Sequence, residues 1–315
     1  MTSAPSRLDR IKARLKPLAT RARYRLEYIG LRIIVGLVRA VPIEVAADVS
    51  ARCWRLLAPL QFRHKRALEN LAIAFPEKTQ AEREEIARAM WANLGRVMAE
   101  TMQIDRLIRQ PERIEIASPH IFQRYKDKLG PLIGVSLHMG NWELAIWPLA
   151  LAGANPAAVY RTVKNPLVDA YLRAQRRDLY PGGLLGRGRI DGSFEEGQKT
   201  ARIITDHVRK GGRLGVICDL HDRYGIEVPF FGTPARSVAI PAMIARRVGA
   251  RIWMARCLRI GTQSRFRIEM KELKVPRTAN LSEDVRTITA GMQQQFEAWI
   301  RETPEQWMWS NRRWS

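Results

Sequence analysis

A histidine and a glutamate five residues apart, His138 and Glu143, are the side chains of this sequence best placed to do chemistry. They lie in the stretch PLIGVSLHMGNWE, residues 131–143, in which an apolar run ends near the histidine and Gly140 and Asn141 follow. Such a run between turn-forming residues predicts a buried strand, a turn and then a helix. We expect Asn141 to cap that helix, which puts Glu143 in its first turn, within reach of the imidazole.

This pair predicts general-base catalysis. A carboxylate bonded to one ring nitrogen fixes the histidine tautomer and stabilises the imidazolium, so that the other nitrogen can take a proton from a hydroxyl. The spacing alone fits equally well a buried structural histidine beside a carboxylate that the helix dipole favours. Ser136 is not a candidate nucleophile, because it lies inside the predicted strand and the second glycine of a G-x-S-x-G elbow is missing.

Several arginines follow the predicted strand AAVYR, residues 157–161. Arg161 ends the strand, and Arg173, Arg176 and Arg177 lie on or near the helix that follows. Ligands of an open α/β sheet bind beyond the carboxyl ends of its strands, and guanidinium groups there indicate an anionic ligand or a developing oxyanion. A solvated basic helix face is the alternative for some of these arginines.

A second strand, RLGVICD, brings acidic residues to the same edge of the sheet. It delivers Asp219, His221 and Asp222 to the side on which His138 lies. We expect Asp219 to order the site through a salt bridge to a helix arginine. One carboxylate and one imidazole also fit a zinc or manganese site, but a dinuclear site needs further ligands. The remaining histidines fall in predicted helices or helical linkers: His64, His120 and His207. We therefore expect no metal and no other cofactor.

Short β-runs alternate with helical patterns from residue 113 onward. The β-runs are 113–117, 131–137, 157–161, 213–219, 251–260 and 266–273, and the helical patterns are 119–129, 142–152, 167–179, 196–209, 237–249 and 282–301. This alternation predicts an α/β fold, a mainly parallel sheet with helices on both faces. The last two runs are close enough to form an antiparallel hairpin at one edge. The glycine-rich segment 181–193 lacks both nucleotide-binding fingerprints and is expected to be a mobile flap beside the site.

The first 41 residues differ in character from the rest. Basic and apolar residues alternate over 1–28, and the apolar run 29–41 carries Arg32 and Arg39. A spanning helix needs ~20 apolar residues, and no signal-peptide cleavage site follows. We predict a helical interfacial membrane anchor over 1–41, with a buried N-terminal helix as the alternative. One domain then covers 42–315; it is helical over 42–110, where Thr79 opens a capping box, and α/β over 111–315.

The charge balance predicts an acidic partner. The chain has 53 Lys and Arg against 31 Asp and Glu, a formal net charge of +22. Nucleic acid, anionic lipid and an acidic carrier protein all fit this charge, but no nucleic-acid-binding motif is present. The three cysteines are far apart, which favours reduced thiols in the cytoplasm or on the cytoplasmic side of a membrane.

Four blocks of the sequence resemble one known family. HMGNWELA, VYRTVKNPLVDAYLRAQR, VPFFGTPARS and PEQWMWSNRRW occur in the order seen in the late acyltransferases of lipid A biosynthesis, and the resemblance runs from about Asn70 to the end. The wider superfamily includes phosphatidylinositol mannoside and glycerolipid acyltransferases, whose fold is the one implied here. Two departures, Leu220 in place of a common glutamine and Asn311 in place of a frequent histidine, leave the acceptor and acyl length open.

The resemblance implies a catalytic dyad of His138 and Glu143, with Arg176 and Asp219 as further site residues. It implies that an acyl chain moves from acyl carrier protein to a hydroxyl of a lipid A precursor at the cytoplasmic face of the bacterial inner membrane. The oxyanion would be stabilised by N–H groups near Gly140 or by an arginine. Another glycolipid or phospholipid acceptor is one alternative, and a non-enzymatic protein that binds membranes or nucleic acid is another.

Overall fold

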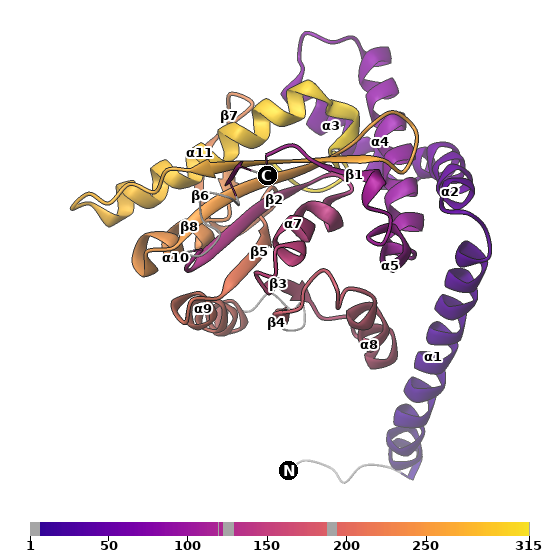
Figure 1. The fold of residues 1–315 in the computed structure, drawn as a ribbon. Helices are drawn as coiled ribbons and strands as arrows, with labels where there is room; N and C mark the ends of the chain where they lie inside the picture. The colour runs from indigo at the N-terminus through magenta and orange to yellow at the C-terminus, as the bar shows by residue number, and fades with distance from the viewer. Residues whose placement is uncertain (1–6, 119, 122–128, 188–193, 315) are drawn as a thin grey trace.

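A seven-stranded sheet forms the centre of the molecule in the computed structural model, which describes residues 7–118, 120–121, 129–187 and 194–314 (Figure 1). The strand order is β1-β9-β8-β2-β5-β3-β4. The strands are β1 Ile114–Ile116, β2 Leu132–Gly140, β3 Pro156–Arg161, β4 Gly183–Arg187, β5 Arg213–Ile217, β8 Arg251–Arg259 and β9 Phe266–Leu273. All neighbouring pairs are parallel except β8 and β9, so the predicted mainly parallel sheet is confirmed.

Three predictions about the strands need correction. The β8–β9 hairpin exists, but β1 pairs with the outer side of β9, so the hairpin is not the edge of the sheet. Residues 183–187 of the predicted flap form β4, paired with β3, and 188–193 lie outside the described residues. A separate antiparallel pair, β6 His221–Phe230 and β7 Thr233–Ser237, was not predicted. Its turn places Phe231 and Gly232 at φ 51° and 70°, a backbone shape that short hairpins require but that phenylalanine rarely adopts.

Helices account for the first third of the chain and lie between the later strands. The helices before the sheet are α1 Arg7–Arg39, α2 Ile43–Leu57, α3 Phe62–Ala74, α4 Gln80–Thr101 and α5 Ile104–Leu107, with short 3-10 turns η1 Ala58–Leu60 and η2 Pro111–Arg113. The later ones are η3 Trp142–Ile146, α7 Trp147–Leu151, α8 Pro166–Gln175, α9 Phe194–Arg209, α10 Ile240–Val248, α11 Leu281–Glu302 and η4 Pro304–Gln306. The capping box of Thr79 and Glu82 at the start of α4 is confirmed. Most of the predicted helix 119–129 lies outside the described residues.

Two hydrophobic cores cover the two faces of the sheet. The larger joins one face to α3, α4, α9, α10, α11 and the C-terminal tryptophans, and the smaller joins the other face to α5, η3 and α7. The side chains of β2 that enter the larger core are Ile133, Val135, Leu137 and Met139. Because side chains alternate along a strand, Gly134, Ser136 and His138 face the other way. Two of these three residues are small, which leaves open space beside the histidine.

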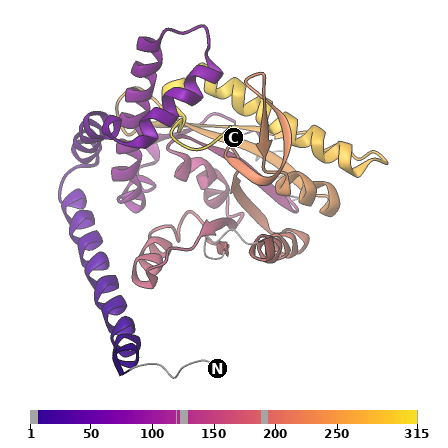
Figure 2. The ribbon, with the colours of Figure 1, turned by 180° about the vertical axis from the view of Figure 1, so that it is seen from behind.

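The N-terminal helix α1 extends away from the sheet and packs along α8 (Figures 1 and 2). Asn165, which caps α8, donates a hydrogen bond from its Nδ2 to the carbonyl of Tyr24, 2.8 Å away. Arg39 at the end of α1 forms a paired hydrogen bond with the carboxylate of Asp105 on α5. Among the described helices, α1 included, none is both long and apolar enough to cross a membrane.

A substitution at Gly140 tests the turn that ends β2. Gly140 has a φ of 56°, and a Cβ there would lie 1.7 Å from the carbonyl oxygen of Cys257. Gly153, after α7, has a similar φ of 71° but open space around a Cβ. We expect Gly153→Ala to lower the free energy of unfolding by about 1–2 kcal/mol, the cost of a left-handed alanine. Gly140→Ala should lose clearly more in the same chemical denaturation experiment, and equal losses would contradict the observed packing of the turn.

Candidate active site

His138 and Asp219 meet at the carboxyl ends of two neighbouring parallel strands. Strands β2 and β5 are in register with Ser136 opposite Ile217, so the residues two positions further on are also adjacent. The imidazole Nδ1 lies 2.8 Å from Asp219 Oδ1, and the backbone N–H of His138 donates to Oδ2, also at 2.8 Å. In the described part of the chain, Nδ1 is the only ring nitrogen bonded to protein, which leaves Nε2 for a ligand.

A tryptophan from the C-terminal segment completes the surroundings of Asp219. The indole N–H of Trp307 donates to Asp219 Oδ2 at 2.7 Å, and both side chains are buried. Around this bond the segment forms a bridge with β2: Met139 pairs with Trp307, and the N–H of Met308 donates to the carbonyl of His138. Sequence reasoning missed Trp307, although it lies in the PEQWMWSNRRW block, because spacing does not show which acceptor an indole reaches.

The expected bond between Glu143 and the imidazole is absent, and the predicted partners of the two carboxylates must be exchanged. Glu143 forms a forked ion pair with Arg176, with Nη2 and Nε at 2.6 and 2.9 Å from its two oxygens. Asp219, expected to pair with a helix arginine, instead bonds His138. The helix after the turn begins as the 3-10 turn η3, which carries Glu143 toward α8 rather than back to the ring.

Asn141 also behaves differently from the prediction. It occupies the N-cap position of η3, but its Oδ1 accepts no capping hydrogen bond; the amide is instead turned toward α4, where its Nδ2 donates to Glu100 Oε2 at 2.9 Å. Its side chain is fully buried. The Gly140–Asn141 turn is therefore held by the helical first third of the chain, a contact that the sequence did not indicate.

The electrostatics favour a protonatable histidine beside an ionised aspartate. Burial alone would lower the pKa of His138, but the Asp219 carboxylate, helped by Glu143, outweighs it and raises the pKa above the ordinary value. Burial would raise the pKa of Asp219, but His138 and the N–H donors around it hold that pKa below its usual range. Burial opposes the charge of Arg176, yet Glu143 raises its pKa overall.

A cavity of about 390 Å³ opens beside His138. Strand β3 pairs with β5 only over 156–158, so beyond this point the two strands separate and Val216 and Ile217 border the opening. Most of the lining is apolar and comes from both faces of the sheet: Trp142, Ala145, Ile146, Leu149, Leu214, Val238, Ile240 and Ile244 are examples. A long apolar group bound here would present its polar end to His138.

The remaining predicted residues divide between the cavity wall and structural roles. Arg161 lines the cavity, as do His221 and Asp222. Arg173 pairs with Asp169 on its own helix. In the described residues no three His, Cys, Asp or Glu side chains gather in a way that could hold a metal ion. Tyr180 also lines the cavity, and burial together with the nearby Glu143 raises its pKa, so the phenol stays neutral at physiological pH.

The fold and the site are those of an α/β protein with a histidine–aspartate pair beside an apolar cavity, an arrangement that suits catalysis on a substrate with a long apolar part. The family model described as bacterial lipid A biosynthesis acyltransferase matches residues 13–315. The lipid A biosynthesis myristoyltransferase of Escherichia coli K12 is 26% identical over 294 residues, covering 91% of this chain and 86% of that protein. The E. coli K12 lauroyltransferase is 26% identical over 305 residues, 92% of each chain. A phosphatidylinositol mannoside acyltransferase of Mycobacterium tuberculosis CDC 1551 / Oshkosh is 26% identical, covering 86% and 83%.

The chain belongs to the bacterial lipid A biosynthesis acyltransferase family. The resemblance expected from the four sequence blocks is thereby confirmed, and it extends further toward the N-terminus than those blocks reached.

Replacing Asp219 tests the histidine–aspartate pair without a substrate. Because the carboxylate raises the pKa of His138, Asp219→Asn should move the proton-binding midpoint of His138 to lower pH, as measured by NMR of the ring. Asp222→Asn, at a cavity-lining residue three positions on, is the control and should leave the midpoint unchanged.

The wild-type midpoint should lie above about 6.5, the ordinary value for histidine. The stabilisation from this pair is complete below that pH and is lost as pH rises through the folded-state pKa. A wild-type midpoint at or below the ordinary value, or no change in Asp219→Asn, would contradict the assignment.

Proposed function

We propose that the protein transfers a fatty acyl chain from acyl carrier protein to a hydroxyl of a lipid A precursor at the cytoplasmic face of the inner membrane. The observation that carries this proposal is His138, which lines an apolar cavity and whose Nδ1 is held by a buried aspartate. The family to which the chain belongs supports an acyltransferase with a lipid A acceptor.

In the proposed reaction, Nε2 of His138 takes the proton of the acceptor hydroxyl while the oxygen attacks the thioester carbonyl carbon. Asp219 stabilises the imidazolium that forms, and the charge of Glu143 adds to this effect. When the intermediate collapses, the carbon–sulfur bond breaks and the imidazolium returns its proton to the leaving thiolate. The ester and the free thiol of the carrier are the products.

The oxyanion of the intermediate needs a positive partner or N–H donors. We assign this role to N–H groups near Gly140 or to an arginine, with Arg161 on the cavity wall and Arg176 beside Glu143 as the candidates. The ion pair with Glu143 fixes the guanidinium of Arg176 in one orientation, which suits preorganised stabilisation.

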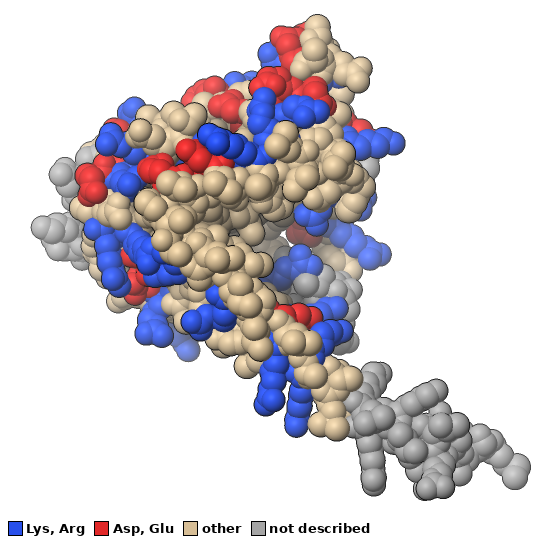
Figure 3. Space-filling view, turned by 90° about the vertical axis from the view of Figure 1, so that its right-hand side faces the viewer, with Lys and Arg blue, Asp and Glu red and all other residues tan. Residues whose placement is uncertain are grey.

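The donor and the membrane both suit the charge of the chain. Acyl carrier protein and the inner leaflet are acidic, and a net charge of +22 attracts both. Several large apolar side chains of α1 and α2 are exposed, among them Leu26, Ile29, Ile33, Leu37, Val45 and Val49. Figure 3 shows a broad surface without charged groups on the side that carries these helices, bordered by Lys and Arg. We propose that this side lies on the membrane.

A second acceptor class is also represented among the relatives. The mycobacterial phosphatidylinositol mannoside acyltransferase is 26% identical to this chain, as the two lipid A enzymes are, over 86% of this chain against 91% and 92%. Parallel assays with a lipid A precursor and with a phosphatidylinositol mannoside therefore decide the acceptor, and transfer to neither would contradict the proposed function.

His138→Ala tests the proposed base. We expect acyl transfer from acyl carrier protein, followed by mass spectrometry of the acceptor, to fall about 10²–10⁴-fold because no other group takes the proton. His64→Gln is the matched control, since His64 also pairs with a carboxylate, that of Glu84 at 2.9 Å, but does not line the cavity. Near-normal turnover in His138→Ala would make the histidine structural.

Polar substitutions on α1 test the membrane surface. Leu26, Ile33 and Leu37 lie on one side of the helix and are 58–70% exposed. Replacing all three with serine should weaken binding to anionic vesicles by about tenfold or more, because each side chain loses apolar burial in the interface. Leu151→Ser, at another exposed leucine at the end of α7, is the control and should bind normally.

Salt should release the wild-type protein from anionic vesicles only in part, because the electrostatic share of binding is screened while the apolar share is not.

Deleting residues 1–41 should move the protein to the soluble fraction and cut activity on vesicle-borne acceptor more than on detergent-dispersed acceptor. Undiminished binding of the triple variant would place the anchor elsewhere, on α2 or α3.

A further inference from the structure

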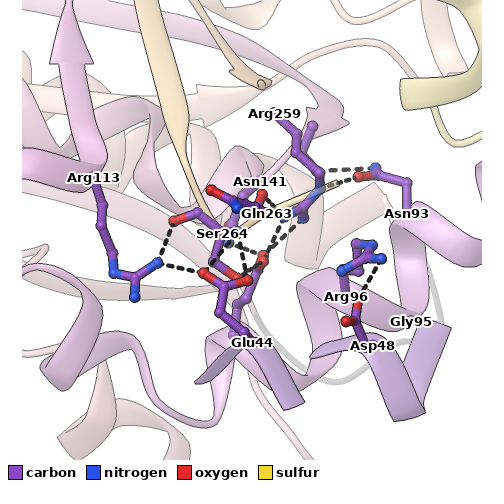
Figure 4. A network of polar contacts seen from close by, with 12 residues as sticks. Glu44, Asp48, Asn93, Gly95, Arg96, Arg113, Asn141, Arg259, Gln263 and Ser264 are labelled. Carbon is purple, nitrogen blue, oxygen red and sulfur yellow. Dashed lines mark hydrogen bonds and ion pairs between the residues drawn. The ribbon is translucent and has the colours of Figure 1, made fainter. Parts of the chain in front are cut away.

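A buried ion pair between Arg259 and Glu100 contacts Asn141, in the turn that follows His138, and Figure 4 shows Arg259, Asn93 and Asn141 in this polar network. Arg259, the last residue of β8, points its guanidinium at Glu100 of α4, and neither side chain is exposed to a significant extent. Nη2 lies 2.8 Å from Oε2, and Nη1 donates to Oε1, so the two groups form a fork. The two residues are 159 positions apart in the chain.

Every nitrogen of this guanidinium donates a hydrogen bond. Beyond the two bonds to Glu100, Nε donates to Asn93 Oδ1 at 3.0 Å, and Nη1 also reaches the carbonyl of Gln263. The backbone of Arg259 is held as well, because Gln306 accepts from its N–H and donates to its carbonyl. Arginine alone offers donors in this rigid arrangement.

The partners of Arg259 hold the turn between His138 and Glu143. Asn93 donates from Nδ2 to the carbonyl of Gly140 at 3.3 Å, and Glu100 accepts from Asn141 Nδ2 at 2.9 Å. The hydrogen bonds from Arg259 fix the orientation of the Asn93 and Glu100 side chains. Arg259 also bonds Gln306, which directly precedes Trp307, the tryptophan that donates to Asp219.

We propose that Arg259 is a positioning residue for the transfer reaction: with Glu100 and Asn93 it sets the turn 139–142 and so the relative placement of His138 and the Glu143–Arg176 pair. This inference rests on the proposed function. A buried ion pair is on average no more stabilising than an apolar pair of the same size, so stability alone does not account for it. Its bonds to the turn assign it a geometric role.

Arg256 provides a matched control on the same strand. It is 5% exposed against 6% for Arg259, and it also pairs with carboxylates, those of Glu269 and Glu302. Its guanidinium lies over the ring of Trp299. None of these partners belongs to the turn, so a substitution at Arg256 disturbs β8 to a similar degree without loosening residues 139–142.

The test compares Arg259→Lys with Arg256→Lys. Lysine keeps the charge but cannot bond Glu100 in a fork and Asn93 at the same time. We expect Arg259→Lys to lower kcat about 10–100-fold, the cost of a misplaced catalytic group, with the KM for the acyl donor within about twofold of wild type. Arg256→Lys should change neither constant. Equal kcat values in the two variants would overturn the proposal.

A measurement without substrate separates this inference from the proposed function. In Arg259→Lys the NMR midpoint of His138 should move to lower pH, because a loosened turn no longer holds the Glu143 carboxylate near the ring, while Asp219 still bonds it. Arg256→Lys should match wild type. An unchanged midpoint in Arg259→Lys would overturn the positioning role even if no transfer is detected, and absence of transfer in wild type would refute the proposed function alone.

A second pair of variants applies if Arg259→Lys does not fold. Asn141 and Ser264 each donate one hydrogen bond to Glu100, at 2.9 and 2.7 Å, but only Asn141 belongs to the turn. Asn141→Ala should lower kcat and move the His138 midpoint, whereas Ser264→Ala should alter neither. Equal effects of the two would show that Glu100 acts only on stability.

Discussion

The structure depends on one buried charge, the carboxylate of Asp219, which has no exposure to solvent. It accepts the N–H of the His138 backbone, the imidazole Nδ1 and the indole of Trp307, and thereby joins β2, β5 and the C-terminal segment at a single point. Removing one member of such a buried arrangement typically costs about 3–5 kcal/mol. The same contacts keep the aspartate ionised and raise the pKa of the histidine. One set of hydrogen bonds therefore both stabilises the fold and makes His138 a stronger base.

The parts of this site that sequence could predict are those set by local patterns. An apolar run that ends at a histidine identified β2, and the alternation of strands and helices identified the sheet and its open edge. The capping box at Thr79 was readable for the same reason, since its two partners are three residues apart. Arg176 and Asp219 were indicated by their positions after predicted strands and again by the family resemblance, and the structure places them beside Glu143 and His138.

The partners of these residues depend on strand order and on long-range packing, which the sequence did not show. The bond of His138 to Asp219 requires β2 and β5 to be neighbours in register, although 81 positions separate the two residues. Glu143 is closer in sequence, but the 3-10 turn directs it to Arg176. Glu100 bonds Asn141 because α4 packs against the turn. The sequence of α4 predicted a helix but did not indicate this contact. Buried polar residues were therefore harder to assign than apolar ones.

In the proposed reaction, Asp219 supports the base His138 directly, and Glu143 contributes a second negative charge. The most direct test is the pH dependence of kcat/KM for acyl transfer, measured side by side for wild type, Asp219→Asn and Glu143→Gln. The rate should rise as His138 loses its proton, at a pH above the ordinary value for histidine, and Asp219→Asn should shift that rise to lower pH further than Glu143→Gln does. A shift in Glu143→Gln with none in Asp219→Asn would contradict the account.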